Sequence, residues 1–343
     1  MRACVVLFLT IALSVACESR HEAKNVKISA YASKDETPKN PPPLSRPEIA
    51  ADADPKKTSF KSSTRDLKVI EKLSTAKIIG IRPISMRSLS LKVTLKGNAK
   101  AVFKPIRKND STARFEVAFY RLAKMLNVGI VPVSTMRLVP RAKIMGHLNV
   151  NFAEAAKSFD IAAKDSRSGA VEGAMIEWIS DIKPTPFDVE GGRRKLTKLL
   201  AIDGPSATEE PLAPMLSSAI VLDYIAGNWD RFSGGNLFFD ASGDNLVLID
   251  NNGAFSRWSK RQQNKMDKLL FAVERYCAKL ISQVRGLNYS KIEGGLFLKS
   301  DKRGKLILDK DEILRIIKRK DDLITRIDSL IAVHGKDKIL VFP

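Results

Sequence analysis

The chain has 343 residues, which corresponds to one large domain or two small ones at about 150 residues per domain. Hydrophobic residues make up 44% and charged residues 28%, so the chain can bury a sizeable core and is not disordered throughout. The net charge of +20 attracts phosphate-bearing partners of every class. Three cysteines exclude a disulfide scaffold, and three histidines disfavour a His-based zinc site.

The N-terminus has the pattern of an export signal. Arg2 supplies a positive charge, an uncharged apolar run extends from Val5 to Val15, and Ser14-Val15-Ala16 is a small-x-small cleavage site. The run is too short to span a bilayer comfortably. We therefore expect residues 1–16 to be a signal peptide; the alternative is a buried N-terminal helix or a retained anchor.

Cys17 follows this site directly and resembles the lipidated cysteine of bacterial lipoproteins, although Ser14 stands where such sites usually carry Leu. The sequence thus predicts an exported protein of bacterial type, either a lipoprotein attached to an envelope membrane through Cys17 or a secreted protein. Five prolines within ten residues mark 17–64 as a Pro- and Lys-rich disordered tether, with the folded part beginning near Leu67.

The rest of the chain shows strand patterns first and helix patterns later. Alternating or apolar runs predict strands at 89–95, 99–103, 131–138 and 171–179, the first two joined by a turn at 96–98. Apolar faces of helical period predict helices at 111–127, 212–226, 263–285 and 311–333. Cys277 would lie on the apolar face of the third helix, as a small core residue. This order is typical of an α+β protein with two lobes, 65–180 and 181–343.

The segment 223–255 gathers carboxylates and carboxamides around two short apolar strands, 236–239 and 246–249. Antiparallel closure of these strands places Asn236 beside Asp250, and Asp230 lies on the loop just before them. Oxygen ligands of this kind suit Mg²⁺ or Mn²⁺, and one remaining Asp can accept a proton from a hydroxyl nucleophile. For each Asp taken alone, the alternative is a turn carboxylate that caps backbone N–H groups.

A second candidate is Lys104, at the end of an apolar strand, followed by a helix that places Glu116 beside its buried face. A lysine on a sheet paired with a helix glutamate is how kinases hold the α- and β-phosphates of ATP. A strand-end lysine alone would more often reach water. Here both residues precede the Asp hairpin, which favours the kinase interpretation.

These residues resemble the four-jointed and secretory-pathway (Golgi casein kinase-like) family of atypical kinases. The similarity covers roughly 70–335. It is carried by these segments: Val102-Phe-Lys-Pro105, Phe115-Glu116, Asp223-Tyr-Ile-Ala-Gly-Asn-Trp-Asp-Arg231, Ile249-Asp-Asn251 and Leu269-Leu-Phe271. The resemblance implies a bilobal kinase-like fold with an N-terminal antiparallel sheet lobe that holds one key helix, and a mostly helical C-terminal lobe.

The resemblance also implies a role for each matching residue. Lys104 would contact the nucleotide phosphates, and Glu116 would pair with it or help to bind metal. Asp230 would be the catalytic base, with Asp250 and Asn236 as metal ligands. Arg87, in the turn 85–90, would lie where other kinases have a Gly-rich loop and would touch phosphate. Glu177, Trp178 and Ile179 would form the hinge that meets adenine; the alternative is an ordinary buried strand end.

Three function classes follow from these features. The first is a kinase that uses ATP and Mg²⁺ or Mn²⁺ to phosphorylate a hydroxyl, with protein Ser or Thr favoured over a glycan and an acidic acceptor suggested by the charge. The second is an inert pseudokinase that serves as a nucleotide- or partner-binding envelope scaffold. The third, a nucleic-acid or anionic-surface binder, is disfavoured because the basic residues are scattered between apolar helix positions without interleaved aromatics.

The sequence lacks the motifs of serine hydrolases and of zinc metalloproteases, so both classes are excluded. The sequence has no Gly-x-Ser-x-Gly elbow and no His-Glu-x-x-His motif, and no histidine lies near a candidate nucleophile.

Overall fold

The computed structural model describes residues 63–343 except 86–88, 167, 188–190 and 299–304. Residues 1–16, predicted as a signal peptide, Cys17, nearly all of the predicted tether and Arg87 lie outside the described residues, so the predictions made for them stay predictions. Asp52–Pro343 belong to one compact unit. Among the described residues, no helix is both long and apolar enough to cross a membrane.

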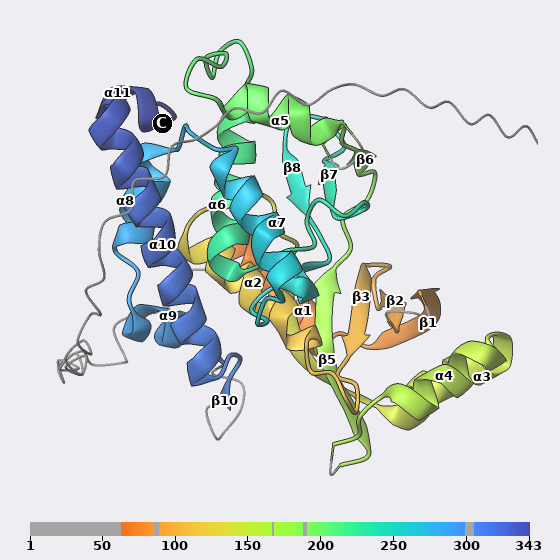
Figure 1. The fold of residues 1–343 in the computed structure, drawn as a ribbon. Coiled ribbons are helices and arrows are strands. Elements are labelled where there is room, and N and C mark those ends of the chain that lie inside the picture. Colours follow the sequence, from red (N-terminus) through yellow and green to blue (C-terminus); the bar gives the residue numbers. More distant parts are fainter. Residues whose placement is uncertain (1–62, 86–88, 167, 188–190, 299–304) are drawn as a thin grey trace, which may run out of the picture. The chain divides into compact units, whose positions relative to one another are not determined.

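The N-terminal part is built on a five-stranded antiparallel sheet in the order β1-β2-β3-β5-β4 (Figure 1). Its strands are β1 (Ile78–Ser85), β2 (Ser90–Leu95), β3 (Lys100–Pro105), β4 (Ser134–Pro140) and β5 (Ala170–Glu177). Side chains alternate along β2, where Leu91, Val93 and Leu95 are buried. The predicted strands and the turn between the first two are confirmed, with ends shifted by a few residues.

Helix α2 (Ala113–Met125) packs against this sheet with its predicted apolar face, which includes Phe115, Phe119 and Leu122. Three further helices accompany it: α1 (Thr64–Thr75), α3 (Arg141–Asn151) and α4 (Ala153–Ala162). The expected antiparallel sheet with one key helix is confirmed, with α2 as that helix and with α1, α3 and α4 in addition. Only Ile144 and Leu148 of α3 are buried, so the helix has no broad apolar face for periodicity to reveal.

The C-terminal part is mostly helical. It contains α5 (Gly192–Leu200), α6 (Leu212–Ala226), α7 (Lys260–Phe271), α8 (Ala278–Arg285), α9 (Tyr289–Gly295), α10 (Lys310–His334) and α11 (Lys336–Ile339). The long helix α10 packs against α6, α8, α9 and α11 (Figure 1). A small antiparallel sheet is formed by β6 (Lys183–Pro184), β7 (Leu237–Phe239) and β8 (Leu246–Leu248), and β9 (Phe297–Leu298) pairs with β10 (Lys305–Leu306).

The predicted helix 263–285 is wrong, because the chain forms α7 and α8 with an extended segment between them. The Tyr276 N–H donates to the carbonyl of Ile339 at 2.7 Å, and the Ala278 N–H donates to that of Phe342 at 3.0 Å. The C-terminal residues thus take hydrogen bonds that a continuous helix would use. Cys277 is accordingly half-buried at the start of α8, where its Sγ contacts the carbonyl oxygen of Pro343, and it is not on a helix face.

Candidate active site

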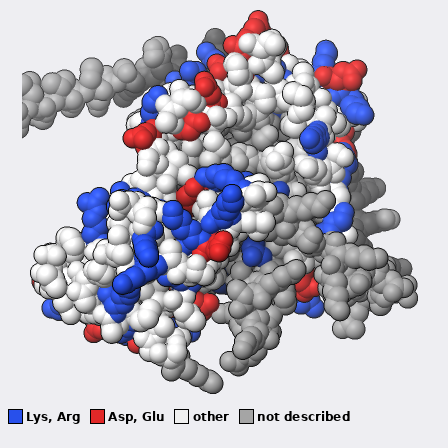
Figure 2. Space-filling model, turned by 180° about the vertical axis from the view of Figure 1, so that it is seen from behind, with Lys and Arg blue, Asp and Glu red and all other residues white. Residues whose placement is uncertain are grey.

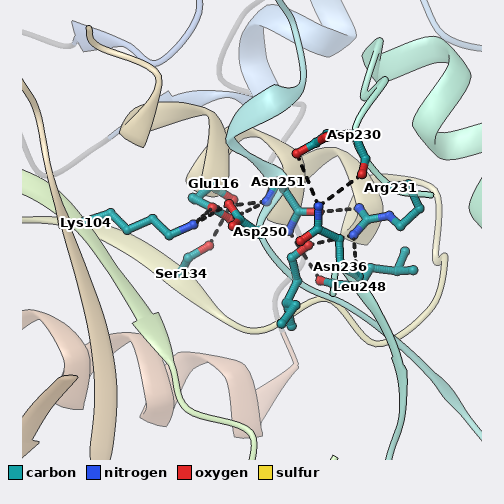
Figure 3. A network of polar contacts seen from close by, with 10 residues as sticks. Lys104, Glu116, Ser134, Asp230, Arg231, Asn236, Leu248, Asp250 and Asn251 are labelled. Atoms are coloured by element: carbon teal, nitrogen blue, oxygen red, sulfur yellow. Dashed lines mark hydrogen bonds and ion pairs between the residues drawn. The ribbon is translucent and has the colours of Figure 1, made fainter. Parts of the chain in front are cut away.

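Lys104 and its two carboxylate partners form the centre of the site (Figure 3). The side chain leaves β3 and its Nζ donates to Glu116 Oε1 at 2.5 Å and to Asp250 Oδ1 at 2.7 Å. Burial alone would lower the pKa of Lys104, but the charges and hydrogen bonds of Glu116 and Asp250 outweigh it and raise this pKa above its ordinary value. The ammonium is therefore held charged between the two carboxylates.

Glu116 also fastens α2 to the loop that carries Asp250. The backbone N–H of Asn251 lies 3.1 Å from Glu116 Oε1 and 3.0 Å from Oε2. Since both carboxylate oxygens serve Lys104 or Asn251, the geometry favours the pairing role predicted for Glu116 over metal ligation. Ser134 adds a hydrogen bond from its Oγ to the carbonyl of Glu116 at 3.1 Å.

Asp250 sits in the left-handed backbone region, with φ of 52° and ψ of 63°. This conformation is uncommon for residues other than glycine, and such residues cluster at functional sites. The Asp250 side chain is 41% exposed, so one face of its carboxylate is open to solvent although Lys104 holds Oδ1.

Asp230 lies on the loop before the hairpin, and Asn236 directly precedes β7. The carbonyl of Asn236 accepts a hydrogen bond from the Ile249 N–H at 3.2 Å, so Asn236 lies opposite the residue that precedes Asp250. Helix α6 ends at Gly227, whose φ of 75° gives the left-handed turn that leads the chain into this loop. The Asn236 Nδ2 donates to the Asp230 carbonyl at 3.1 Å and to Asp230 Oδ2 at 3.3 Å. Asp230 is half-buried, and Figure 3 shows it in the same polar network as Asp250 and Asn251.

Arg231 is the buried hub that joins these segments, and its relative exposure is 1%. Its guanidinium binds both carboxylate oxygens of Asp223, at 3.0 and 3.1 Å. It also donates to the carbonyls of Asn236 and Ile249, both at 2.7 Å, and to Asn251 Oδ1. Burial raises the pKa of Asp223, whereas Arg231 acts against that rise.

Asp223 and Arg231 have roles that the sequence interpretation did not assign. Both were part of the family motif, and Asn228 between them donates to Asp223 Oδ1 at 3.2 Å. The available signal was Asp223 itself, because a carboxylate inside the apolar run of α6 calls for a buried partner of opposite charge.

The predicted hinge lies at the end of β5, and its polar groups are partly used within the protein. The Glu177 N–H donates to the carbonyl of Val133, and the Trp178 N–H donates to that of Lys100. Glu177 Oε1 accepts from Arg65 at 2.5 Å, and the Trp178 ring lies 3.4 Å from Lys92 Nζ. The hinge role of Glu177, Trp178 and Ile179 remains a prediction. Because the N–H groups of Glu177 and Trp178 already donate within the protein, adenine would have to contact other backbone groups of this segment.

The donor set fits a hard divalent cation. Among the described residues no group of three or more His, Cys, Asp or Glu is placed to hold a metal. Mg²⁺ usually binds through one or two carboxylates, with waters and substrate phosphates completing its shell. The carboxylate of Asp250 and the carboxamide oxygen of Asn236 are donors of this kind.

A five-stranded sheet with a lysine–glutamate pair, set against helices and two loops that each carry an aspartate, defines a kinase-like α+β fold. Among solved structures, the chain is similar to the Golgi casein kinase with Mn/ADP bound, with a TM-score of 0.59 and 15% identity over 81% of this chain and 79% of that one. A second structure of the Golgi casein kinase gives 0.57 and 14% over 82% and 78%. The structure of hydra Fam20 with sugar gives 0.58 and 14% over 82% and 93%.

These likenesses concern the fold. They confirm the α+β kinase-like class and the structural resemblance inferred from the sequence. No family model matches the chain, and no curated protein matches it. Because one fold hosts many functions, the activity has to be argued from the site.

Proposed function

We propose that the protein is an exported, metal-dependent kinase that transfers the γ-phosphoryl group of ATP to a hydroxyl acceptor. The observation that carries this proposal is the placement of Lys104 Nζ between Glu116 and Asp250. A buried ammonium that is charged at neutral pH, beside a partly exposed carboxylate, suits the phosphates and the cation of a metal–nucleotide complex. The Golgi casein kinase of similar fold was solved with Mn/ADP bound, which supports the same ligands here.

Each residue then has a defined task. Lys104 neutralises phosphate charge, and Glu116 keeps its ammonium in place. Asp250 and Asn236 would hold Mg²⁺ or Mn²⁺, which when bound offsets charge on the phosphate oxygens. Asp230 orients the acceptor hydroxyl and accepts its proton, and the Asn236 amide fixes the direction of its carboxylate.

The test is phosphotransfer by the full chain, with γ-labelled ATP, Mn²⁺ or Mg²⁺, and casein-like and glycan acceptors. Asp230→Ala and Asp250→Ala should each reduce transfer, the first by about 10²–10⁴-fold if Asp230 is the base. Transfer at the wild-type level by Asp230→Ala would refute the role of that residue. Metal-dependent nucleotide binding without any transfer would instead support the pseudokinase.

The distribution of charged side chains on the surface gives little support to the alternative of nucleic-acid binding. On the face shown in Figure 2, Lys and Arg lie in several separate groups, with Asp and Glu among them. Among the described residues, several Lys and Arg side chains are paired with carboxylates, as in the contact of Lys318 with Asp322 at 2.7 Å and that of Arg141 with Asp160 at 2.8 Å. A duplex-binding surface would present a continuous basic stripe.

A further inference from the structure

A pocket of about 1100 Å³ opens between the loop around Asp230 and helix α7. Trp229 and Phe232 of the loop line one side; Trp229 directly precedes Asp230 in the chain, and Phe232 follows it by two residues. Five cations surround the pocket: Arg193 of α5 and Lys260, Arg261, Lys265 and Lys268 of α7. No carboxylate is found among the described residues that line it. The pocket therefore has a strongly positive lining beside the proposed catalytic base.

The cations are tied to the loop that carries Asp230. Lys265 Nζ donates to Ser233 Oγ at 2.7 Å and lies 5.6 Å from the centre of the Trp229 ring. Arg193 donates to the carbonyl of Phe232 at 3.2 Å. An acceptor held in this pocket would thus be held at a set place relative to Asp230, as phosphoryl transfer requires.

The remaining lining favours a saccharide over a peptide. The half-buried Trp229 offers an aromatic ring, and the side-chain amides of Gln262 and Asn264 offer N–H donors to sugar hydroxyls. The Ser259 hydroxyl and the Gln262 carbonyl oxygen are already used in the capping box at the start of α7. The described lining residues come from two helices and a loop, and none lies in a strand. The pocket therefore offers no sheet edge to an extended peptide.

We propose that this pocket binds an acidic saccharide unit of a glycan acceptor, with the cations on its anionic group and its hydroxyl directed to Asp230. This inference rests on the proposed kinase function and names its acceptor class. It departs from the sequence-based preference for protein Ser or Thr. The anionic group is a carboxylate, sulfate or phosphate on the sugar, all of which pair with Lys and Arg.

The first test is binding without nucleotide, which keeps it separate from the kinase assay. Oligogalacturonate is titrated into the full chain at about 0.15 M salt, where long-range charge effects are screened beyond about 8 Å. Lys260→Ala with Lys268→Ala should weaken binding by about tenfold through the loss of two charge contacts. The matched control is Lys336→Ala with Lys338→Ala on α11, which removes the same charge outside the pocket lining and should leave binding unchanged.

Three outcomes would overturn the proposal: no binding of oligogalacturonate, equal loss in both double variants, or tighter binding of poly-glutamate than of oligogalacturonate. A neutral oligosaccharide of the same length should bind more weakly than oligogalacturonate, and equal binding would refute the role of the cations.

A second experiment measures the transfer of labelled phosphate from ATP to oligogalacturonate and to a peptide acceptor. Transfer to peptide that is unaffected by the α7 double variant would refute the pocket's role while the kinase function stands. Saccharide binding without any transfer would refute the kinase function and leave the saccharide site in place.

Discussion

Arg231 shows how one side chain sets the geometry of the site. Its guanidinium holds the carboxylate of Asp223 near the end of α6, and it reaches the carbonyls of Asn236 and Ile249, which face each other at the open end of the hairpin. The residues on either side of this hub, Asp230 and Asp250, carry the proposed chemistry. A buried cation that serves three chain segments therefore fixes how far apart the two functional carboxylates stand.

We expect Arg231→Met to lower the free energy of unfolding by about 3–5 kcal/mol, the range measured when a buried ion pair loses one partner. Methionine removes both the charge that pairs with Asp223 and the planar fork that binds the carbonyls of Asn236 and Ile249. Urea denaturation of the variant and the wild type measures the difference. A loss below about 1 kcal/mol would show that the hub is not structurally important.

Lys104 gives a pH-dependent prediction. Its pKa is raised in the folded protein, so its ion pairs stabilise the fold fully below the ordinary lysine pKa of about 10.4. This contribution is lost as the pH rises through the higher folded value. The stability difference between the wild type and Lys104→Met should stay constant from neutral pH to about pH 10 and shrink above it. Denaturant titrations across this range measure it; a difference that shrinks already near neutral pH would contradict the assignment.

At the scale of elements, α2 is held from both ends. Arg114 near its start binds Glu312 of α10 with two hydrogen bonds, at 2.7 and 2.6 Å. Near its other end, Tyr120 and Lys124 bind the buried Asp66 of α1 at 3.0 and 2.9 Å. Glu116 sits between these anchors, so the lysine–glutamate pair is held in place by the surrounding elements.

Asp66→Asn tests the α1 anchor. Burial alone would raise the pKa of Asp66, but Lys124 and Tyr120 lower it below its ordinary value. The stabilisation is therefore present above about pH 3.9 and is lost as the pH falls through the lower folded value. At neutral pH the variant should be less stable by about 1.5–3 kcal/mol, the range for hydrogen bonds to charged groups. Asp337→Asn, at an exposed position on α11, serves as the control, and an equal loss in both would refute the anchor.

Elements with a strong internal pattern could be predicted from the sequence. The expected helix 212–226 agrees with α6 at both ends, and the strand pair around residues 96–98 was found from alternation alone. The expected helix 263–285 was wrong because the C-terminal residues pair with 276–278, which no local pattern contains. Helical period shows which residues are apolar, but it does not show which distant segment competes for their backbone groups.

The candidate site likewise has a part that could be predicted from the sequence and a part that could not. Lys104, Glu116, Asp230 and Asp250 could be predicted because their order along the chain matches a known family, and the hairpin argument placed Asn236 beside them. The contact of Glu116 with the backbone of Asn251 spans 135 residues, and that of Arg231 with the carbonyl of Ile249 spans 18. Residue type gives no signal for such contacts, so the sequence could name the candidate side chains but not what holds them.

At the scale of the whole molecule, the contacts Lys104–Asp250, Glu116–Asn251 and Arg114–Glu312 join the sheet-based part to the helical part. All three lie along or next to α2, so the proposed nucleotide site is also the place where the two parts meet. A ligand that binds Lys104 and Asp250 together would therefore stabilise the folded protein as a unit.

We expect ATP with Mn²⁺ to raise the melting temperature, because binding to the folded state alone adds about 2.7 kcal/mol at a ligand concentration about 100 times Kd. At about 2–4 °C per kcal/mol for a domain of roughly this size, the shift is about 5–10 °C. Asp250→Asn should lose the metal-dependent part of the shift, and Lys104→Met should lose the larger part of the nucleotide shift even with metal present. Asp230→Asn should keep the full shift, since its proposed role is toward the acceptor. Thermal unfolding of the four proteins with ATP alone, Mn²⁺ alone and both together separates these effects. An equal shift in the wild type and in Asp250→Asn would show that the nucleotide binds elsewhere.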